Sequence, residues 1–221
     1  NRKATRGNIE SVLRITLLLA FPAGLGIFAL SGPILNLLFS GRMMEAAIIA
    51  PVLRIMGLSA ILVSVTTTVN SMLQAVGLVK LPVKLMLAGG VIKLITNYCL
   101  VAVPGINIQG VPYGTFFCYL FIVGASLFAL HRKTGFYIHL SSVVLRPLGA
   151  GIICAASAYL SHSLLSRLSS SRFITLIAIG IGGLFYAAAL LALGCVKRED
   201  LQMLPMGEKI LKMLEKRGLI M

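Results

Sequence analysis

Acidic side chains are scarce in this chain and are missing from the interior of its long apolar runs. Of 221 residues, 6 are Asp or Glu and 20 are Lys or Arg, which gives a net charge of +14 at pH 7. The acids lie at the ends of apolar runs or in the stretches between them: Glu10, Glu45, Glu199, Asp200, Glu208 and Glu215. Acid/base catalysis by paired carboxylates is therefore unsupported, and we expect no enzyme.

Motifs that hold metals or cofactors are also missing. The chain has no CxxC pair, no P-loop, no HExxH and no GxSxG, and its 3 histidines have no ligand spacing. Its cysteines lie inside or at the end of apolar runs, where we expect small buried side chains: Cys99, Cys118, Cys154 and Cys195. We expect no metal, no disulfide and no cofactor.

Charge is sparse and apolar residues dominate. The chain is 58% hydrophobic and 12% charged, with a mean hydropathy of +0.97, which is typical of a polytopic membrane protein. The basic residues fall between the apolar runs and form no single patch, so a nucleic-acid partner is excluded. They fit cytoplasmic loops and anionic lipid head groups instead.

Six apolar runs predict an all-α integral membrane protein with about six transmembrane helices. The runs cover about residues 12–39, 46–76, 83–103, 111–130, 148–165 and 173–196. Pro22 and Pro33 predict a tilted or kinked first helix, and Gly24 and Gly26 predict close packing on it. We therefore divide the chain into a membrane region, 1–196, and a tail, 197–221.

The tail and the loops carry most of the positive charge. In the tail, apolar and charged residues alternate as in an amphipathic helix on a membrane surface, although a solvated tail is also compatible. Counting Lys and Arg in alternate loops and at the adjoining span ends, one side holds Arg42, Arg167 and Arg172. The other side holds fifteen: Arg2, Lys3, Arg6, Arg14, Lys80, Lys84, Arg132, Lys133, Arg146 and the six of the tail. The positive-inside rule then places both ends in the cytoplasm.

Lys93 is a cation where hydrocarbon is expected. It lies ten residues into the third run, roughly 15 Å along a helix from Val83 and hence near the middle of a ~30 Å hydrocarbon core. Three environments would satisfy it: a ligand or water-filled cavity, a carboxylate from another part of the protein, or an interface reached by snorkelling. Arg54 in the second run raises the same question.

Two polar faces accompany these cations. On the second run, Ser59, Thr66, Thr67, Asn70 and Gln74 share one face, while Arg54 points nearly the opposite way. On the third run, the face around Lys93 contains Gly89, Gly90, Thr96 and Asn97. The candidate cavity residues are Lys93, Arg54, Asn97, Asn70 and Gln74; the amides are weaker signals, because interhelical hydrogen bonds are their common use.

Several short motifs occur in a recognisable order. They are Leu19-Ala20-Phe21-Pro22-Ala23-Gly24-Leu25-Gly26, Pro33-Ile34-Leu35-Asn36-Leu37-Leu38-Phe39, Ser71-Met72-Leu73-Gln74-Ala75-Val76-Gly77, Ile92-Lys93-Leu94-Ile95-Thr96-Asn97-Tyr98 and Ile108-Gln109-Gly110-Val111-Pro112-Tyr113-Gly114-Thr115. In this order the chain resembles polysaccharide biosynthesis proteins of the stage V sporulation protein B type. These belong to the multidrug/oligosaccharidyl-lipid/polysaccharide (MOP) exporter superfamily.

The resemblance implies a two-lobed bundle of fourteen helices, of which this chain would be the last six. It implies a flippase of the cell membrane that moves a lipid-linked oligosaccharide or peptidoglycan precursor by alternating access. Lys93 and, less directly, Arg54 would hold the substrate's pyrophosphate. The expected partners are that substrate, membrane lipids and the preceding helices, because the chain begins at Asn1 without an initiator Met and looks cut from a longer protein.

Two other functions remain open at this stage. A drug/cation antiporter of the same superfamily would be expected to need an intramembrane carboxylate, which the rest of the protein would have to supply. A membrane scaffold without transport would leave Lys93 facing lipid.

Overall fold

The fold is built from six long helices. The computed structural model describes residues 2–39, 43–103, 105, 107–135, 141–168 and 173–193, and within these ranges it contains helices and no strand. The helices are α1 (Arg2–Leu38), α2 (Met43–Ala75), α3 (Lys80–Val101), α4 (Val111–Thr134), α5 (Arg146–Leu168) and α6 (Phe173–Ala192), with a 3-10 turn η1 (Asn107–Gly110) and a π-helical turn η2 (Ser141–Leu145). The predicted all-α class is confirmed.

All six of these helices are long and apolar enough to cross a membrane, as the sequence predicted. Their boundaries differ from the predicted ones chiefly at α1, which begins at Arg2 rather than Val12. No proline precedes Pro22, so the polar segment before the apolar run continues the same helix. The predicted tail, 197–221, lies outside the described residues.

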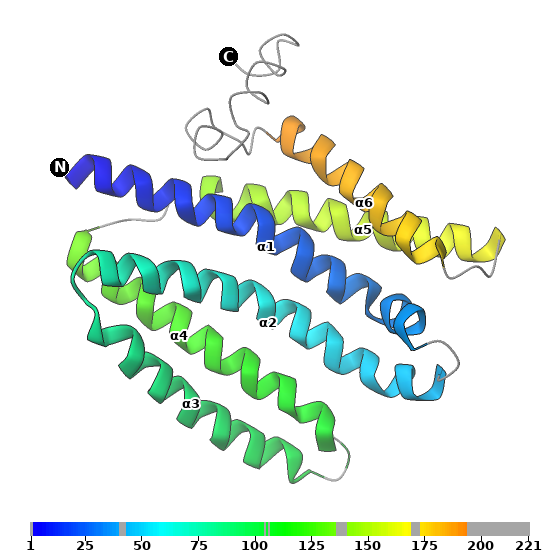
Figure 1. Ribbon diagram of the computed structural model, residues 1–221, viewed down its shortest axis with the longest axis horizontal. Coiled ribbons are helices and arrows are strands. Elements are labelled where there is room, and N and C mark those ends of the chain that lie inside the picture. Colours follow the sequence, from blue (N-terminus) through cyan, green and yellow to red (C-terminus); the bar gives the residue numbers. More distant parts are fainter. Residues whose placement is uncertain are drawn as a thin grey trace.

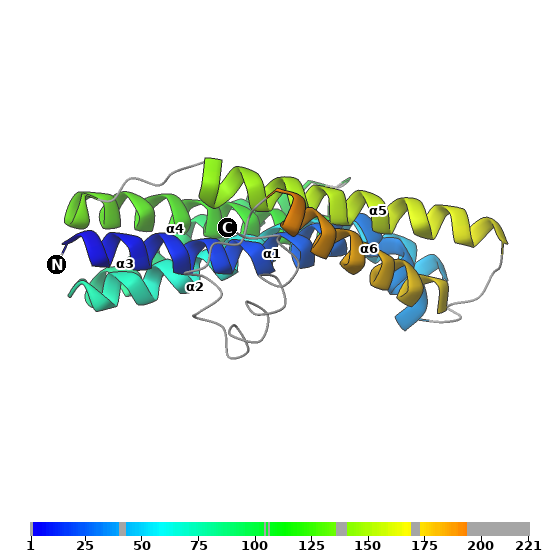
Figure 2. The same ribbon diagram turned by 90° about the horizontal axis from the view of Figure 1, so that it is seen from above.

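The helices pack in an order that differs from their order in the chain. Going from one edge to the other, α6 packs on α5, α5 on α1, α1 on α2, α2 on α4 and α4 on α3 (Figure 1). Seen from above, the long helices run side by side along one direction (Figure 2). As a result α1 is enclosed by its neighbours, whereas α3 lies at an edge and packs mainly on α4.

Glycines with left-handed backbone end two of the helices. Gly77 has φ 87° and follows α2 at the predicted turn, and Gly135 has φ 63° directly after α4. The Gly135 N–H donates to the carbonyl oxygen of His131 at 2.7 Å, which satisfies one of the last carbonyls of α4. Glycine adopts this conformation without steric cost, so both helices stop sharply.

The two prolines of α1 have different effects. A kink lies near Pro33, as predicted, whereas Pro22 leaves a backbone carbonyl without its helical partner. Near Pro33 the helix is kinked, with Leu30 at φ −104° and ψ 18°. Pro22 has no N–H, so the carbonyl of Leu18 loses its helical partner. The hydroxyl of Tyr186 on α6 donates a hydrogen bond to that carbonyl oxygen, which ties α6 to α1 at the proline.

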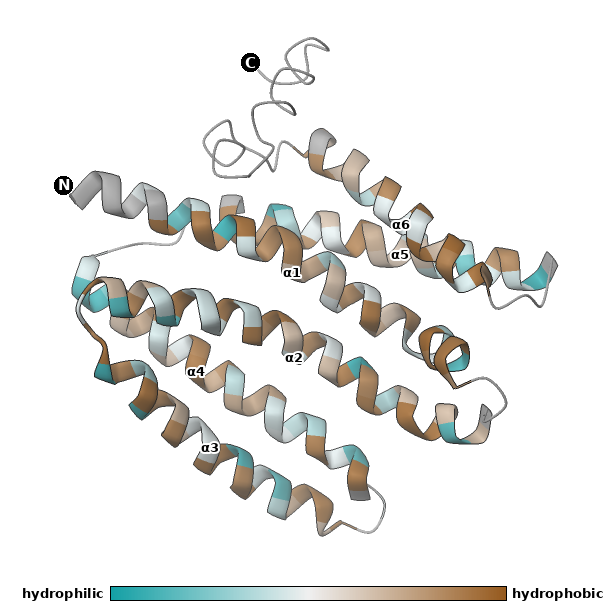
Figure 3. Cartoon of the chain, viewed as in Figure 1, coloured by the Kyte–Doolittle hydropathy of each residue, from teal (hydrophilic) through white to brown (hydrophobic). Residues whose placement is uncertain are grey.

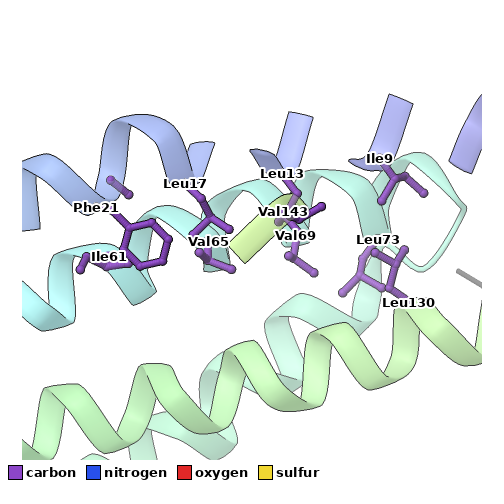
Figure 4. Packing of buried hydrophobic residues seen from close by; sticks show 11 residues of the cluster. Ile9, Leu13, Leu17, Phe21, Ile61, Val65, Val69, Leu73, Leu130 and Val143 are labelled. Atoms are coloured by element: carbon purple, nitrogen blue, oxygen red, sulfur yellow. The ribbon is translucent and has the colours of Figure 1, made fainter. Parts of the chain in front are cut away.

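The main core lies between α1 and α2. Leu13, Leu17 and Phe21 of α1 meet Val65 and Val69 of α2, with Leu73 and Leu130 at one end of the same cluster (Figure 4). Hydrophobic residues recur along all six described helices (Figure 3), and many large apolar side chains are exposed while others are buried. In a bilayer, association of these helices is therefore stabilised by close packing rather than by withdrawal of apolar surface from water.

Two glycines let α1 and α2 cross closely. A Cβ atom on Gly24 would come within 2.6 Å of the Gly57 carbonyl oxygen, and one on Gly57 within 2.7 Å of the Gly24 carbonyl oxygen. Close packing at Gly24 is thus confirmed. The same prediction is wrong for Gly26 within the described part of the chain, where a Cβ atom on Gly26 would meet nothing within 4 Å.

Candidate functional site

Lys93 lies near the middle of α3, the most exposed helix of the six. The most apolar stretch of α3 is 6% buried, against 39% for that of α1. Counted from Lys80, Lys93 is roughly 20 Å along a helix roughly 33 Å long, so it is ~3 Å from the midpoint. The residue is half-buried, and its carbonyl oxygen lies 3.3 Å from the position of a Cβ atom on Gly114 of α4. Cys118 of α4 and Cys154 of α5 are buried as predicted, whereas Cys99 of α3 is exposed, so that prediction is wrong for Cys99.

Asn97, one turn after Lys93, sits against a glycine of α4. The side-chain oxygen of Asn97 occupies the position that a Cβ atom on Gly114 would need, and its Cγ would be 2.9 Å from that atom. This Oδ1 atom is buried without a hydrogen-bond partner among the described residues. The structure therefore brings two of the predicted residues, Lys93 and Asn97, to the α3–α4 contact.

Arg54 is placed in a different environment. It is exposed on α2, and its Nε donates to the Ser31 hydroxyl oxygen of α1 at 3.0 Å. It lines an open hollow of about 370 Å³ together with residues of α1 and α5: Leu25, Phe28, Ala29, Ile152, Ala155, Ala156 and Tyr159. Arg54 thus faces the α1 side of α2, whereas Lys93 is on the helix beyond α4.

The polar stripe predicted on α2 divides into a buried part and an exposed part. Ser59, Thr66 and Asn70 are buried, with 3%, 1% and 6% of their surface exposed, while Thr67 and Gln74 are exposed. Asn70 Oδ1 and Thr66 Oγ1 have no hydrogen-bond partner within the described ranges. Asn70 therefore lies inside the helix packing, and Gln74 lies on the surface at the end of α2.

The structure also shows polar groups that the sequence reasoning missed. The Thr16 and Thr68 hydroxyl oxygens lie 2.9 Å apart and join α1 to α2. Next to them is an open hollow of about 490 Å³, to which Thr67, Thr68 and Ser71 contribute hydroxyls. Hydroxyl residues recur every three or four positions along α2, and this spacing could have predicted a face of hydroxyl groups on that helix. Ser126 on α4, fully buried with an unpartnered Oγ, gave no such signal.

Arg14 needs a correction. The charge count treated it as a loop residue, but it lies within the membrane-capable segment Ile9–Leu38 with 3% of its surface exposed. Arg14 follows the core residue Leu13 directly, and the membrane-capable segment starts five residues before Arg14, at Ile9. Removing Arg14 from the count leaves the excess of Lys and Arg on the predicted cytoplasmic side unchanged in sign.

These features define a class of protein. Six apolar helices of this length indicate a multi-pass membrane protein. Among the described residues, no group of three or more His, Cys, Asp or Glu side chains could hold a metal ion. The polar side chains found at the helix contacts above are cations, amides and hydroxyls, which can form charge-assisted or neutral hydrogen bonds.

Comparison with known proteins agrees with this class. Residues 1–99 match the MatE family, and this segment contains Arg54, Asn70, Gln74, Lys93 and Asn97. Over 97% of its length the chain is 24% identical to the uncharacterized membrane protein YabM of Bacillus subtilis (strain 168). The chain spans 40% of the length of that relative. No solved structure matches the chain.

Proposed function

We propose that this chain is part of a membrane transporter of the MOP exporter type and that Lys93 contacts the anionic head group of a lipid-linked saccharide. The observation that carries the proposal is a half-buried lysine ~3 Å from the midpoint of the least buried helix. The match of residues 1–99 to the MatE family supports the transporter class. The substrate is proposed from the chemistry of the site and the family resemblance.

The charge pattern favours an anionic ligand for Lys93. The sequence has no Asp or Glu between Glu45 and Glu199, so α3, α4, α5 and α6 contain none. A cation at this depth is costly in hydrocarbon, and it is usually kept where it faces a cavity, a partner charge or an ion pathway. A pyrophosphate would satisfy it with charge-assisted hydrogen bonds.

Asn97 would add a hydrogen bond from the same helix. Its Oδ1 atom is packed against Gly114 of α4, so the side-chain amide N–H group, a donor to phosphate or saccharide oxygens, would make this bond. Asn70 and Gln74 remain predicted cavity residues on α2. We also propose that both ends of the chain are cytoplasmic, that the parent lies in the cell membrane and that it works by alternating access against further helices.

The experiment is a transport assay on the full-length parent protein in vesicles. We would measure translocation of a fluorescent polyprenyl-pyrophosphate saccharide for wild type, Lys93→Arg, Lys93→Gln and Lys93→Ala, at matched expression and folding. Activity kept by Arg and lost in Gln and Ala is the expected result. Wild-type activity in all three variants would contradict a contact between Lys93 and the substrate.

The same preparation separates the flippase from the antiporter and from a scaffold. A cation-driven antiporter would export organic cations and would be expected to depend on an intramembrane carboxylate, which α3 to α6 do not contain. A scaffold would move neither class of substrate. Translocation of the pyrophosphate lipid without export of cations is the outcome that the flippase proposal requires.

A further inference from the structure

The hollow beside Arg54 combines one cation with apolar walls. Arg54 contributes the charge, and seven residues of α1 and α5 complete the wall: Leu25, Phe28, Ala29, Ile152, Ala155, Ala156 and Tyr159. Its volume, about 370 Å³, lies within the range of small-molecule sites. A ligand that fits both features has an anionic group joined to an apolar body.

The geometry of Arg54 leaves most of its guanidinium available. Its Nε is used by the Ser31 hydroxyl at 3.0 Å, and Ser31 itself is fully buried, so this bond fixes the base of the side chain. The nearest acid in sequence, Glu45, is nine residues away on the same helix, or roughly 14 Å along the axis. A planar guanidinium held in this way presents its remaining donors as a fork that matches a phosphate.

The depth of Arg54 suits a phosphate at the edge of the hydrocarbon. It is roughly 15 Å from the Met44 end of a span roughly 48 Å long, and therefore ~9 Å from the middle. From there an arginine reaches the head-group region by snorkelling, since half of a hydrocarbon core is ~15 Å. The exposed Tyr159 on α5 also lines the hollow.

From these observations we propose that the hollow between α1, α2 and α5 binds a membrane phospholipid, with its phosphate on Arg54 and an acyl chain against the apolar wall. The site is separate from Lys93, which lies on α3 beside α4. The proposal therefore does not rest on the proposed function, and either one can fail without the other.

The test is native mass spectrometry of the purified full-length parent protein titrated with phosphatidylglycerol. Diacylglycerol with the same acyl chains, which has no phosphate, and glycerol phosphate, which has no chains, are the comparison ligands. We expect phosphatidylglycerol to bind at least tenfold more tightly than either, because a charge-assisted hydrogen bond and the apolar contact are both needed.

Variants of Arg54 and Ala156 test separately whether binding needs the charge of Arg54 and the open space of the hollow. Arg54→Gln is expected to weaken phosphatidylglycerol binding about tenfold, and Arg54→Lys to weaken it less. Ala156→Phe places a ring in the hollow without changing charge, and it should also weaken binding. The matched control is Arg167→Gln, which removes an exposed arginine from the last turn of α5 outside the hollow and should leave binding unchanged.

Three results would overturn the proposal. One is equal binding of phosphatidylglycerol to wild type, Arg54→Gln and Ala156→Phe. Another is an equal loss in Arg54→Gln and Arg167→Gln, which would indicate attraction by net charge alone. The third is displacement of phosphatidylglycerol by an equimolar polyprenyl-pyrophosphate saccharide, which would assign the hollow to the transported lipid.

Discussion

Helices α1 and α3 are both membrane-capable, yet they are held in opposite ways. Helix α1 packs on α2, α5 and α6, and its most apolar stretch is 39% buried, whereas α3 packs mainly on α4 and its most apolar stretch is 6% buried. The enclosed helix supplies most of the core cluster, and the edge helix carries Lys93 and Asn97. We therefore expect the stability of this part of the protein to depend on α1, whereas the exposed helix α3 is where we propose that the substrate binds.

The largest loss of stability is expected from a larger side chain at the place where α1 and α2 cross. Gly24→Val adds a branched side chain whose Cβ atom would lie 2.6 Å from the Gly57 carbonyl oxygen. Because that oxygen belongs to the backbone of α2, it cannot move aside easily. Overpacking of this kind costs about 3 kcal/mol of the free energy of unfolding. Thermal unfolding of the purified parent protein measures the loss.

A neighbouring glycine on the same helix provides the control for this substitution. A Cβ atom on Gly26 meets nothing within 4 Å, so Gly26→Val changes only the intrinsic helix preference and should cost less than about 1 kcal/mol. Equal destabilisation by the two variants would show that α1 and α2 do not cross at Gly24.

The next largest effect is expected at the α3–α4 contact. Gly114→Ala puts a methyl group where the Asn97 side chain lies, with the Lys93 carbonyl oxygen only 3.3 Å away. We expect a loss of about 2 kcal/mol in unfolding free energy, together with a larger loss of substrate binding than the stability change explains. Gly124→Ala, on the same helix in open space, is the control, and a binding loss equal to that of Gly114→Ala would refute the contact.

A smaller effect is expected from the bond between α6 and α1. Tyr186→Phe removes the hydroxyl that donates to the Leu18 carbonyl oxygen, which Pro22 leaves without a helical partner. One hydrogen bond of this kind contributes about 1 kcal/mol. The melting temperature should fall in Tyr186→Phe and fall no further when Pro22→Ala is added, because alanine restores a backbone donor for Leu18. An additive loss in the double variant would disprove this link.

The smallest effect on stability is expected on the outer face of α3. Leu94 and Tyr98 are 71% and 82% exposed, so Leu94→Ala and Tyr98→Ala should each change the unfolding free energy by less than about 0.5 kcal/mol. A loss above about 2 kcal/mol in the parent protein would show that another helix covers this face and would remove the contrast with α1.

The sequence predicted the elements better than their contacts. Length and hydropathy were enough for six spans, because a bilayer fixes the length of apolar run that crosses it. Periodicity placed Lys93 and Asn97 on one face correctly, since both lie on a regular helix. It could not tell that α3 packs mainly on α4, or that Gly24 touches α2 and Gly26 touches nothing, because such contacts depend on the packing order of the helices.

The proposed role of Lys93 is tested most directly by chemical restoration of its charge. In the parent protein with its native cysteines replaced, Lys93→Cys would be treated with a cationic aminoethyl or an anionic sulfonatoethyl methanethiosulfonate, with Lys84→Cys as the control. The account predicts that Lys93→Cys is inactive in transporting the pyrophosphate lipid, and that the cationic reagent restores transport while the anionic reagent does not. Full activity of unmodified Lys93→Cys, or equal effects of both reagents, would contradict it.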